Sequence, residues 1–224
     1  MPVDALQCSA QVMASLNAAD QREAPYRHWR LANVLPGEAV DAVNALDLAP
    51  PSWEGADGRR AWNNERLFID QEMMAHEPAA VALAEGLQSR EVLAKIEEMG
   101  GVDLTGMFLR IEYCMDSQGF WLEPHTDLGV KRLTLLVYCA RDPKAAGWGT
   151  SIYSDADHWA GNMDGSFNNA LMFIPADNTW HGFEPREIQG LRRSMIVNYV
   201  TPEWRARQEL AFPDRPVPPR HQRQ

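Results

Sequence analysis

Residues 107–114, which read MFLRIEYC, form the stretch that decides the fold. Met107, Leu109, Ile111 and Tyr113 alternate there with a second set of side chains, and a period of two is typical of a β-strand. Clusters of turn-forming residues separate the short β-favouring runs that follow. These runs lie at 120–124, 133–139, 150–153, 170–174 and 194–200. The C-terminal half of the chain is therefore predicted to be a series of short strands.

The residues before this stretch have mainly a helical pattern, apart from β-favouring residues at 26–35 and a short strand candidate at 66–70. Pro36-Gly37-Glu38 is typical of a helix start, and Pro50-Pro51 is expected to end that helix before a loop at 52–60. Apolar residues at helical spacing between 78 and 99, followed by Gly100-Gly101, predict one or two amphipathic helices with a glycine stop. Helices followed by many short strands favour a β-sandwich or barrel flanked by helices.

Composition places the chain among soluble globular proteins. It has 224 residues, 45% of them hydrophobic, and a formal net charge of −10 with histidine neutral. The length suits a single domain, with a helical support region at 1–105, a strand core at 106–201 and an extended, proline-rich tail at 212–224. The acidic balance argues against partners such as a nucleic-acid backbone or an anionic membrane surface.

Cysteine usage and the N-terminus bear on the compartment. The chain has three cysteines, too few and too widely spaced for a disulfide framework. Cys114 and Cys139 lie in apolar runs and are predicted to be buried thiols. The N-terminus lacks the basic start of a signal peptide and carries Asp4 instead. These features favour a cytoplasmic location, while the oligomeric state is left open.

A candidate metal site starts at His125-Thr126-Asp127, which follows a predicted strand. Residues i and i+2 of a strand point to the same face, so this imidazole and this carboxylate can bind one ion from one side. His181 is the natural third ligand, because it follows the predicted strand at 170–174. Two histidines and one carboxylate form the facial triad of non-haem Fe(II) oxygenases, which leaves positions open for oxygen and an organic cosubstrate.

A candidate anion receptor comes eleven residues after His181. Arg192 and Ser194 share one face of the last predicted strand. A guanidinium binds a carboxylate through two parallel hydrogen bonds, so this pair suits the tail of a dicarboxylate. Arg193 is the alternative cation, although the spacing favours Arg192.

Residues 107–201 resemble the Fe(II)/2-oxoglutarate-dependent oxygenases, in particular the bacterial branch related to the prolyl hydroxylases. The helical N-terminal portion is similar only in general layout. The matching features are Tyr113 on the first strand, the segment 122–127 with the metal pair, the turn Gly149-Thr150, the distal His181 and the turn Gly190-Leu191-Arg192.

The resemblance implies a fold, a site and a reaction. The fold is a double-stranded β-helix, or jelly-roll, with α-helices packed on one sheet. The implied iron ligands are His125, Asp127 and His181. Arg192 would bind the distal carboxylate of 2-oxoglutarate, with hydrogen bonds from Ser194 and Tyr113. The implied enzyme is a dioxygenase that uses Fe(II), 2-oxoglutarate and O2 to hydroxylate a substrate, with release of succinate and CO2.

The substrate does not follow from the resemblance, because fold and cofactor do not fix it. A small metabolite, an amino acid and a peptide residue are all compatible. The lack of a repeat or an appended domain favours a small molecule over a protein partner. Two other functions stay open: a jelly-roll binding protein without oxygenase activity, and a metal-dependent enzyme of the same fold that does not use 2-oxoglutarate.

Overall fold

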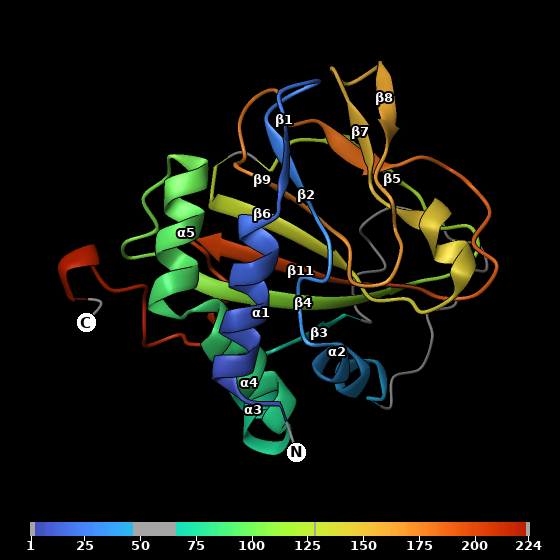
Figure 1. The fold of residues 1–224 in the computed structure, drawn as a ribbon. Coiled ribbons are helices and arrows are strands. Elements are labelled where there is room, and N and C mark those ends of the chain that lie inside the picture. The colour runs from blue at the N-terminus through green and yellow to red at the C-terminus, as the bar shows by residue number, and fades with distance from the viewer. Residues whose placement is uncertain (1–2, 47–65, 128, 223–224) are drawn as a thin grey trace.

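The structure is a computed structural model that describes residues 3–46, 66–127 and 129–222. Its strands form two antiparallel sheets (Figure 1). In order of neighbouring strands, the larger sheet consists of β1 (Asp20–Arg22), β2 (His28–Leu31), β9 (Ala170–Phe173), β6 (Lys131–Tyr138), β11 (Arg192–Val200), β4 (Phe108–Asp116) and β3 (Leu67–Phe68). The smaller sheet consists of β5 (Leu122–His125), β10 (His181–Phe183), β7 (Ser151–Tyr153) and β8 (Trp159–Asn162). This arrangement confirms the predicted mainly β core.

The two faces of the larger sheet differ in chemistry, as strand β4 shows. Leu109, Ile111 and Tyr113 belong to the main hydrophobic core. The alternate side chains, among them Arg110 and Glu112, line a cavity between the two sheets. Because successive side chains of a strand point to opposite faces, the same strand supports the core and the cavity.

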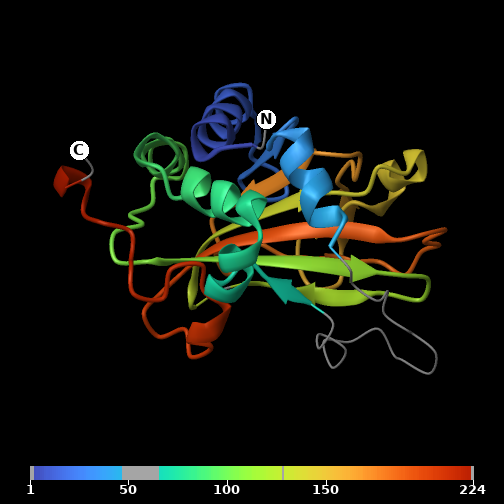
Figure 2. The ribbon, with the colours of Figure 1, turned by 90° about the horizontal axis from the view of Figure 1, so that it is seen from below.

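Helices cover the apolar face of the larger sheet (Figure 2). The longest are α1 (Ala5–Asn17), α4 (Pro78–Leu87) and α5 (Arg90–Gly100), with α2 (Gly37–Asn44) and the short α3 (Gln71–His76) beside them. Buried residues of these helices, such as Leu83 and Leu93, pack in one cluster with the apolar residues of β4 and β11. The predicted packing of helices on one sheet is confirmed, and the smaller sheet is left to close the cavity.

The ends of the helices follow local sequence signals. Helix α5 ends at Gly101, whose φ of +63° lies in the left-handed region that glycine adopts at low cost, as the glycine stop predicted. Helix α2 begins directly after Pro36, as predicted. The expected helix end at Pro50-Pro51 and the loop at 52–60 lie outside the described residues.

The proline-rich tail docks on the start of β4. The Val217 N–H donates to the carbonyl of Met107 (2.8 Å), and the Gly106 N–H donates to the carbonyl of Val217 (2.8 Å). Val217 is buried, and Phe212 packs against the main core. This part of the tail is therefore extended and held in place by the core.

Two further observations concern the cysteines and the character of the helices. Cys114 and Cys139 are buried free thiols, as predicted, and so is Cys8. Among the helices that the structure describes, none combines the length and apolar character that a membrane crossing requires.

Candidate metal centre

Strand pairing in the smaller sheet brings the two predicted histidine ligands together. Strands β5 and β10 are antiparallel, and His125 lies directly opposite His181 in their register. The two imidazole ring centres are 4.3 Å apart. Gly182 permits this approach, because a Cβ atom there would lie 2.6 Å from the carbonyl oxygen of Leu122. The two strands can therefore pair closely at the histidines only with glycine at this position.

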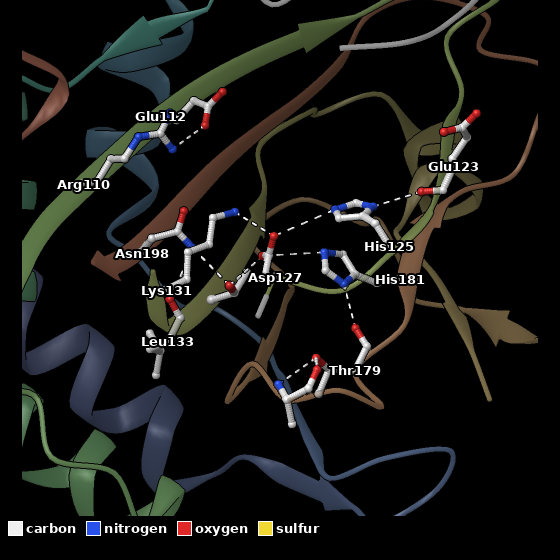
Figure 3. Close-up of polar contacts among 12 residues, drawn as sticks. Arg110, Glu112, Glu123, His125, Asp127, Lys131, Leu133, Thr179, His181 and Asn198 are labelled. Atoms are coloured by element: carbon white, nitrogen blue, oxygen red, sulfur yellow. Dashed lines mark hydrogen bonds and ion pairs between the residues drawn. The ribbon is translucent and has the colours of Figure 1, made fainter. Parts of the chain in front are cut away.

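Asp127 completes the group just beyond the end of β5. The Nε2 atom of His125 lies 3.9 Å from Oδ1 of Asp127, and Nε2 of His181 lies 3.7 Å from Oδ2 (Figure 3). The candidate ligand atoms of the three residues all lie within 4.8 Å of one another. Asp127 and His181 are buried, whereas His125 is partly exposed at the cavity. The structure thus brings all three residues predicted from the sequence to one point.

Backbone carbonyls fix the orientation of both imidazoles. Nδ1 of His125 donates to the carbonyl of Glu123 (2.9 Å), and Nδ1 of His181 donates to the carbonyl of Thr179 (2.9 Å), as Figure 3 shows. Because a carbonyl oxygen can only accept, each neutral ring carries its proton on Nδ1 and its lone pair on Nε2. The two Nε2 lone pairs are the ligand positions that a metal ion would use.

The Asp127 carboxylate is held by two donors of its own. The Lys131 ammonium donates to Oδ1 (2.8 Å), and the Thr134 hydroxyl donates to Oδ2 (2.9 Å). The Asn198 amide in turn donates to the Thr134 hydroxyl (3.0 Å). Burial by itself would raise the pKa of Asp127, but the nearby Lys131 and His181 outweigh it and hold this pKa below its usual range. The carboxylate is therefore ionised at neutral pH and ready to bind a cation.

Lys131 and Thr134 were not among the residues predicted for the site. The sequence signals were present but not decisive. Lys131 lies four residues after Asp127, a spacing that surface residues also show, and Thr134 shares an inward register with many ordinary sheet residues. Only the fold places their polar atoms against the carboxylate.

The triad opens into a cavity of about 450 Å³ between the two sheets. Arg192 and Ser194 line this cavity together with the triad. The Arg192 Nε–H donates to the carbonyl of Trp148 (2.8 Å), and its Nη1 forms an ion pair with Asp116. Its guanidinium carbon lies 4.7 Å from the ring centre of Phe183. Arg192 is thus a buried cation that lines the cavity beside Phe183.

The neighbouring arginine points the other way. Nη1 of Arg193 donates to the carbonyl of Asn44 (2.6 Å) and to the hydroxyl of Tyr113 (3.0 Å) on the helix-covered face. Of the two arginines left open by the sequence, Arg192 is the one on the cavity face. The period of two along β11 accounts for the difference.

The expected position of Tyr113 is wrong. Tyr113 is buried in the helix-facing core, and its hydroxyl donates to Oδ1 of Asn44 (2.9 Å). On β4 the residues that line the cavity are those in register with Arg110, and Tyr113 has the opposite parity. The hydroxyl therefore supports Arg193 and contributes nothing to the cavity wall.

Sequence reasoning also missed a charged wall at the far end of the cavity. Arg110 donates to Glu112 (2.6 Å) and to Glu209 (2.7 Å), and Arg66 donates to Glu112 (2.8 Å). The Arg110 guanidinium lies over the rings of Phe68 and Trp204, at 4.8 Å from each. The alternation on β4 could have revealed Arg110 and Glu112 as a polar face. Their partners come from distant segments that no local pattern connects.

Comparisons with known proteins show the fold. No protein-family profile matches the chain, and neither does any curated protein sequence. Among solved structures, a prolyl-4-hydroxylase of Pseudomonas putida aligns with a TM-score of 0.55 at 13% identity, over 90% of this chain and 98% of its own. A prolyl hydroxylase of Trichoplax adhaerens, solved with a peptide of hypoxia inducible factor, aligns with a TM-score of 0.57 at 14% identity, over 86% and 88%.

A prolyl 4-hydroxylase of Phytophthora capsici aligns with a TM-score of 0.60 at 11% identity, over 91% of this chain and 68% of its own. The three structures share the architecture described above, and the expected jelly-roll fold is confirmed. At these identities the similarity concerns the fold, whereas the His-Asp-His group is a feature of this chain itself.

Proposed function

We propose that this protein is a non-haem Fe(II)- and 2-oxoglutarate-dependent oxygenase that hydroxylates a small, polar substrate. The observation that carries the proposal is the convergence of His125, Asp127 and His181 at one wall of a cavity whose end holds a buried arginine. The fold shared with prolyl hydroxylases adds support at the level of architecture.

The donor set fits Fe(II). Two imidazole nitrogens and one carboxylate are the ligands of the facial triad, and the cavity gives access from the open side. The carbonyls of Glu123 and Thr179 fix the tautomer of both rings, and Thr134 orients the carboxylate. Such outer hydrogen bonds orient metal ligands and are part of a functional metal site.

When bound there, Fe(II) supplies the redox chemistry by which O2, 2-oxoglutarate and a substrate C–H bond give succinate, CO2 and a C–OH group. The residues of the chain then bind and orient. Arg192 binds the distal carboxylate of 2-oxoglutarate, and Ser194 offers a hydroxyl from the same face of β11. The aromatic rings of Phe120 and Phe183 line this end and keep it low in water.

The size and polarity of the cavity support a small, charged or amino-acid-like substrate. A volume of about 450 Å³ lies in the range of small-molecule sites. The wall away from Arg192 carries Arg66, Arg110 and Glu112, which could pair with the charged groups of such a molecule. A peptide residue is the alternative substrate, in keeping with the peptide bound by the Trichoplax adhaerens enzyme.

One observation favours a different function on the same fold. Asp116 already pairs with Arg192, so the charge of this arginine is neutralised without a cosubstrate. This is what a metal-dependent enzyme that uses no 2-oxoglutarate would require. Such an enzyme would turn over its substrate with Fe(II) and O2 at an unchanged rate when 2-oxoglutarate is withheld.

The test is a screen of amino acids and polar metabolites with Fe(II), O2 and 2-oxoglutarate, read by substrate-dependent succinate formation. We expect at least one compound to stimulate succinate release and the His125→Ala variant to abolish it. His158→Ala is the matched control, because His158 is an exposed histidine on the turn before β8. Succinate release that persists in His125→Ala would contradict the proposal.

A further inference from the structure

The cation that faces the cosubstrate end of the cavity is neutralised by a residue of the same sheet. Arg192 on β11 lies directly opposite Asp116 on β4 in the strand register, and Nη1 of Arg192 pairs with Oδ2 of Asp116. Asp116 is 2% exposed, and it also lines the cavity. Taken together, this buried pair carries no net charge.

A second guanidinium contacts the same aromatic ring as Arg192. Arg186 lies 4.0 Å from the ring centre of Phe183, the ring that Arg192 also contacts at 4.7 Å. Adjacent carbonyls hold the two groups: Arg186 donates to Gly149, and Arg192 donates to Trp148. Burial and the nearby charge of Arg192 lower the pKa of Arg186 to about 10, which still leaves it charged at neutral pH.

Arg186 packs on Phe183 without lining the cavity itself, and its charge interacts with the nearby carboxylate of Glu184. Its Nε and Nη1 are buried, and their N–H groups donate no hydrogen bond to the residues that the structure describes. A buried donor without a partner is costly, and a buried cation beside another cation more so. The charges of Arg192, Arg186, Asp116 and Glu184 balance here, so a change in any one of them alters the attraction for a carboxylate of a ligand.

We propose that Asp116 is a positioning residue that holds Arg192 toward the cavity and limits its attraction for the cosubstrate, while Arg186, packed on Phe183, adds positive charge that strengthens this attraction. This inference rests on the proposed function and specifies how the 2-oxoglutarate end of that site is tuned. Arg192 makes the contact, and its two neighbours set the strength.

The charge count gives opposite signs for two substitutions. Asp116→Asn keeps the shape of the side chain but raises the local net charge by one, so 2-oxoglutarate should bind more tightly. Arg186→Gln lowers the local net charge by one, so 2-oxoglutarate should bind more weakly. Charges within a few ångströms in a partly buried site interact strongly enough for changes on the order of 10-fold.

The experiment measures the dissociation constant of 2-oxoglutarate for protein loaded with Mn(II), by titration calorimetry. The matched controls are Asp157→Asn and Arg27→Gln, both at exposed positions. A second titration uses 2-oxobutanoate, which has the same 2-oxo acid group but no distal carboxylate. We expect both effects to be several-fold larger for 2-oxoglutarate than for 2-oxobutanoate, a selectivity that a merely structural role would not produce.

Thermal melting adds a readout that is independent of activity. Asp116→Asn removes the carboxylate that pairs with Arg192, so the Tm of this variant should be lower than that of the wild type when 2-oxoglutarate is absent. Addition of 2-oxoglutarate should raise the Tm of the variant by more than it raises the Tm of the wild type. Equal or weaker 2-oxoglutarate binding by folded Asp116→Asn would overturn the role of Asp116.

Arg186→Gln changes the local charge without breaking the Arg192–Asp116 ion pair. It therefore tests the effect of charge on 2-oxoglutarate affinity even when Asp116→Asn folds poorly. Unchanged affinity in Arg186→Gln would overturn the role of Arg186. A wild-type protein that binds Mn(II) but no 2-oxoglutarate would refute the proposed function itself, and would be recognised as such before any variant is made.

Discussion

At the residue scale, the metal centre depends on side chains that hold the ligands as much as on the ligands. Thr134 donates to Oδ2 of Asp127 (2.9 Å) and receives a hydrogen bond from Asn198 (3.0 Å). This short chain fixes the rotamer of the carboxylate in the absence of a metal. Without it, Asp127 would have to be ordered when the metal binds, at a cost in affinity.

Replacing Thr134 with valine should therefore weaken metal binding by about 10- to 100-fold, the usual effect of losing an outer hydrogen bond to a metal ligand. The measurement is a calorimetric titration with Mn(II). Thr105→Val, at the turn before β4, is the control and should bind Mn(II) as the wild type does. Equal affinities in the two variants would show that Thr134 does not position the carboxylate.

A second residue-scale prediction concerns acid sensitivity. His28 is fully buried, and burial lowers its pKa below the ordinary value. Below pH of about 6.5 the unfolded chain binds a proton at this histidine that the folded protein does not, so the free energy of unfolding falls as the pH falls. We expect urea unfolding to show a smaller loss of stability between pH 7.5 and pH 5.5 in His28→Phe than in the wild type.

Wild type and His28→Phe contain the same remaining histidines, so the difference between their two pH slopes isolates His28. Identical slopes would mean that His28 is protonated equally in the folded and unfolded states.

The sequence predicts the ligands better than their supports. His125 and Asp127 share a face because of a local rule, and His181 follows from the order of strands. Lys131, Thr134 and Asp116 act through contacts between strands far apart in the chain, and no local pattern reveals such contacts. For Tyr113, the resemblance implied a role in the cavity, whereas the alternation along its own strand predicted a side chain on the same face as Leu109 and Ile111. The structure follows the alternation, because Tyr113 lies in the main hydrophobic core.

At the element scale, one turn positions the cation end of the cavity. The turn at Trp148 and Gly149 follows a short 3₁₀ helix (Pro143–Trp148), and its carbonyls bind Arg192 and Arg186. Gly149 is required by close approach, because a Cβ atom there would lie 2.0 Å from the carbonyl oxygen of Met163. The sequence marked this glycine as part of a turn but could not show what it packs against.

Gly149→Ala should destabilise the protein by about 1–3 kcal/mol, the usual cost of overpacking, because a backbone atom must move to make room. Gly147→Ala is a matched control two residues away, where a Cβ atom meets nothing within 4 Å, and should change stability by less than about 0.5 kcal/mol. Urea unfolding of both variants provides the comparison. Equal stabilities would contradict the tight packing of this turn.

The strands themselves were largely predictable, whereas their pairing was not. Periodicity indicated β4, β6, β9 and β11, since each has a clear alternation or a buried run. The short edge strand β8 has exposed side chains and no such signal. Pairing of β5 with β10 brings residues 125 and 181 opposite each other, which depends on the closed fold and on Gly182.

At the scale of the whole molecule, the helical layer supports the sheet that carries half of the cavity wall. Leu83 on α4 is fully buried in the main core, and Val81 on the same helix is 38% exposed. Leu83→Ala should lower the free energy of unfolding by about 2–5 kcal/mol, as expected for a truncated core leucine.

The control Val81→Ala should change the free energy of unfolding by no more than about 0.5 kcal/mol. Urea unfolding measures both variants. Because α4 lies on the face away from the cavity, Mn(II) affinity of the folded Leu83→Ala protein should equal that of the wild type. A loss of metal affinity would show that the helices shape the site as well as stabilise it.

Charge is distributed unevenly over the molecule. The chain has a net charge of −10, whereas the cavity wall carries equal numbers of basic and acidic side chains: Arg66, Arg110, Lys131 and Arg192 against Glu112, Asp116, Asp127 and Glu209. The cavity is therefore less acidic than the chain as a whole, and its basic groups lower the repulsion of an anionic cosubstrate. The sequence indicated one such group at Arg192, while the others depend on how the sheets face each other.

The central claim is that His125, Asp127 and His181 hold a metal ion to which 2-oxoglutarate then binds. The most direct test is equilibrium binding of 2-oxoglutarate to the protein under anaerobic conditions, with and without Fe(II). The account predicts a single 2-oxoglutarate per chain in the presence of Fe(II), and loss of this binding without Fe(II) or in His181→Ala. Binding that is equally tight without Fe(II), or in the His181→Ala protein, would contradict it.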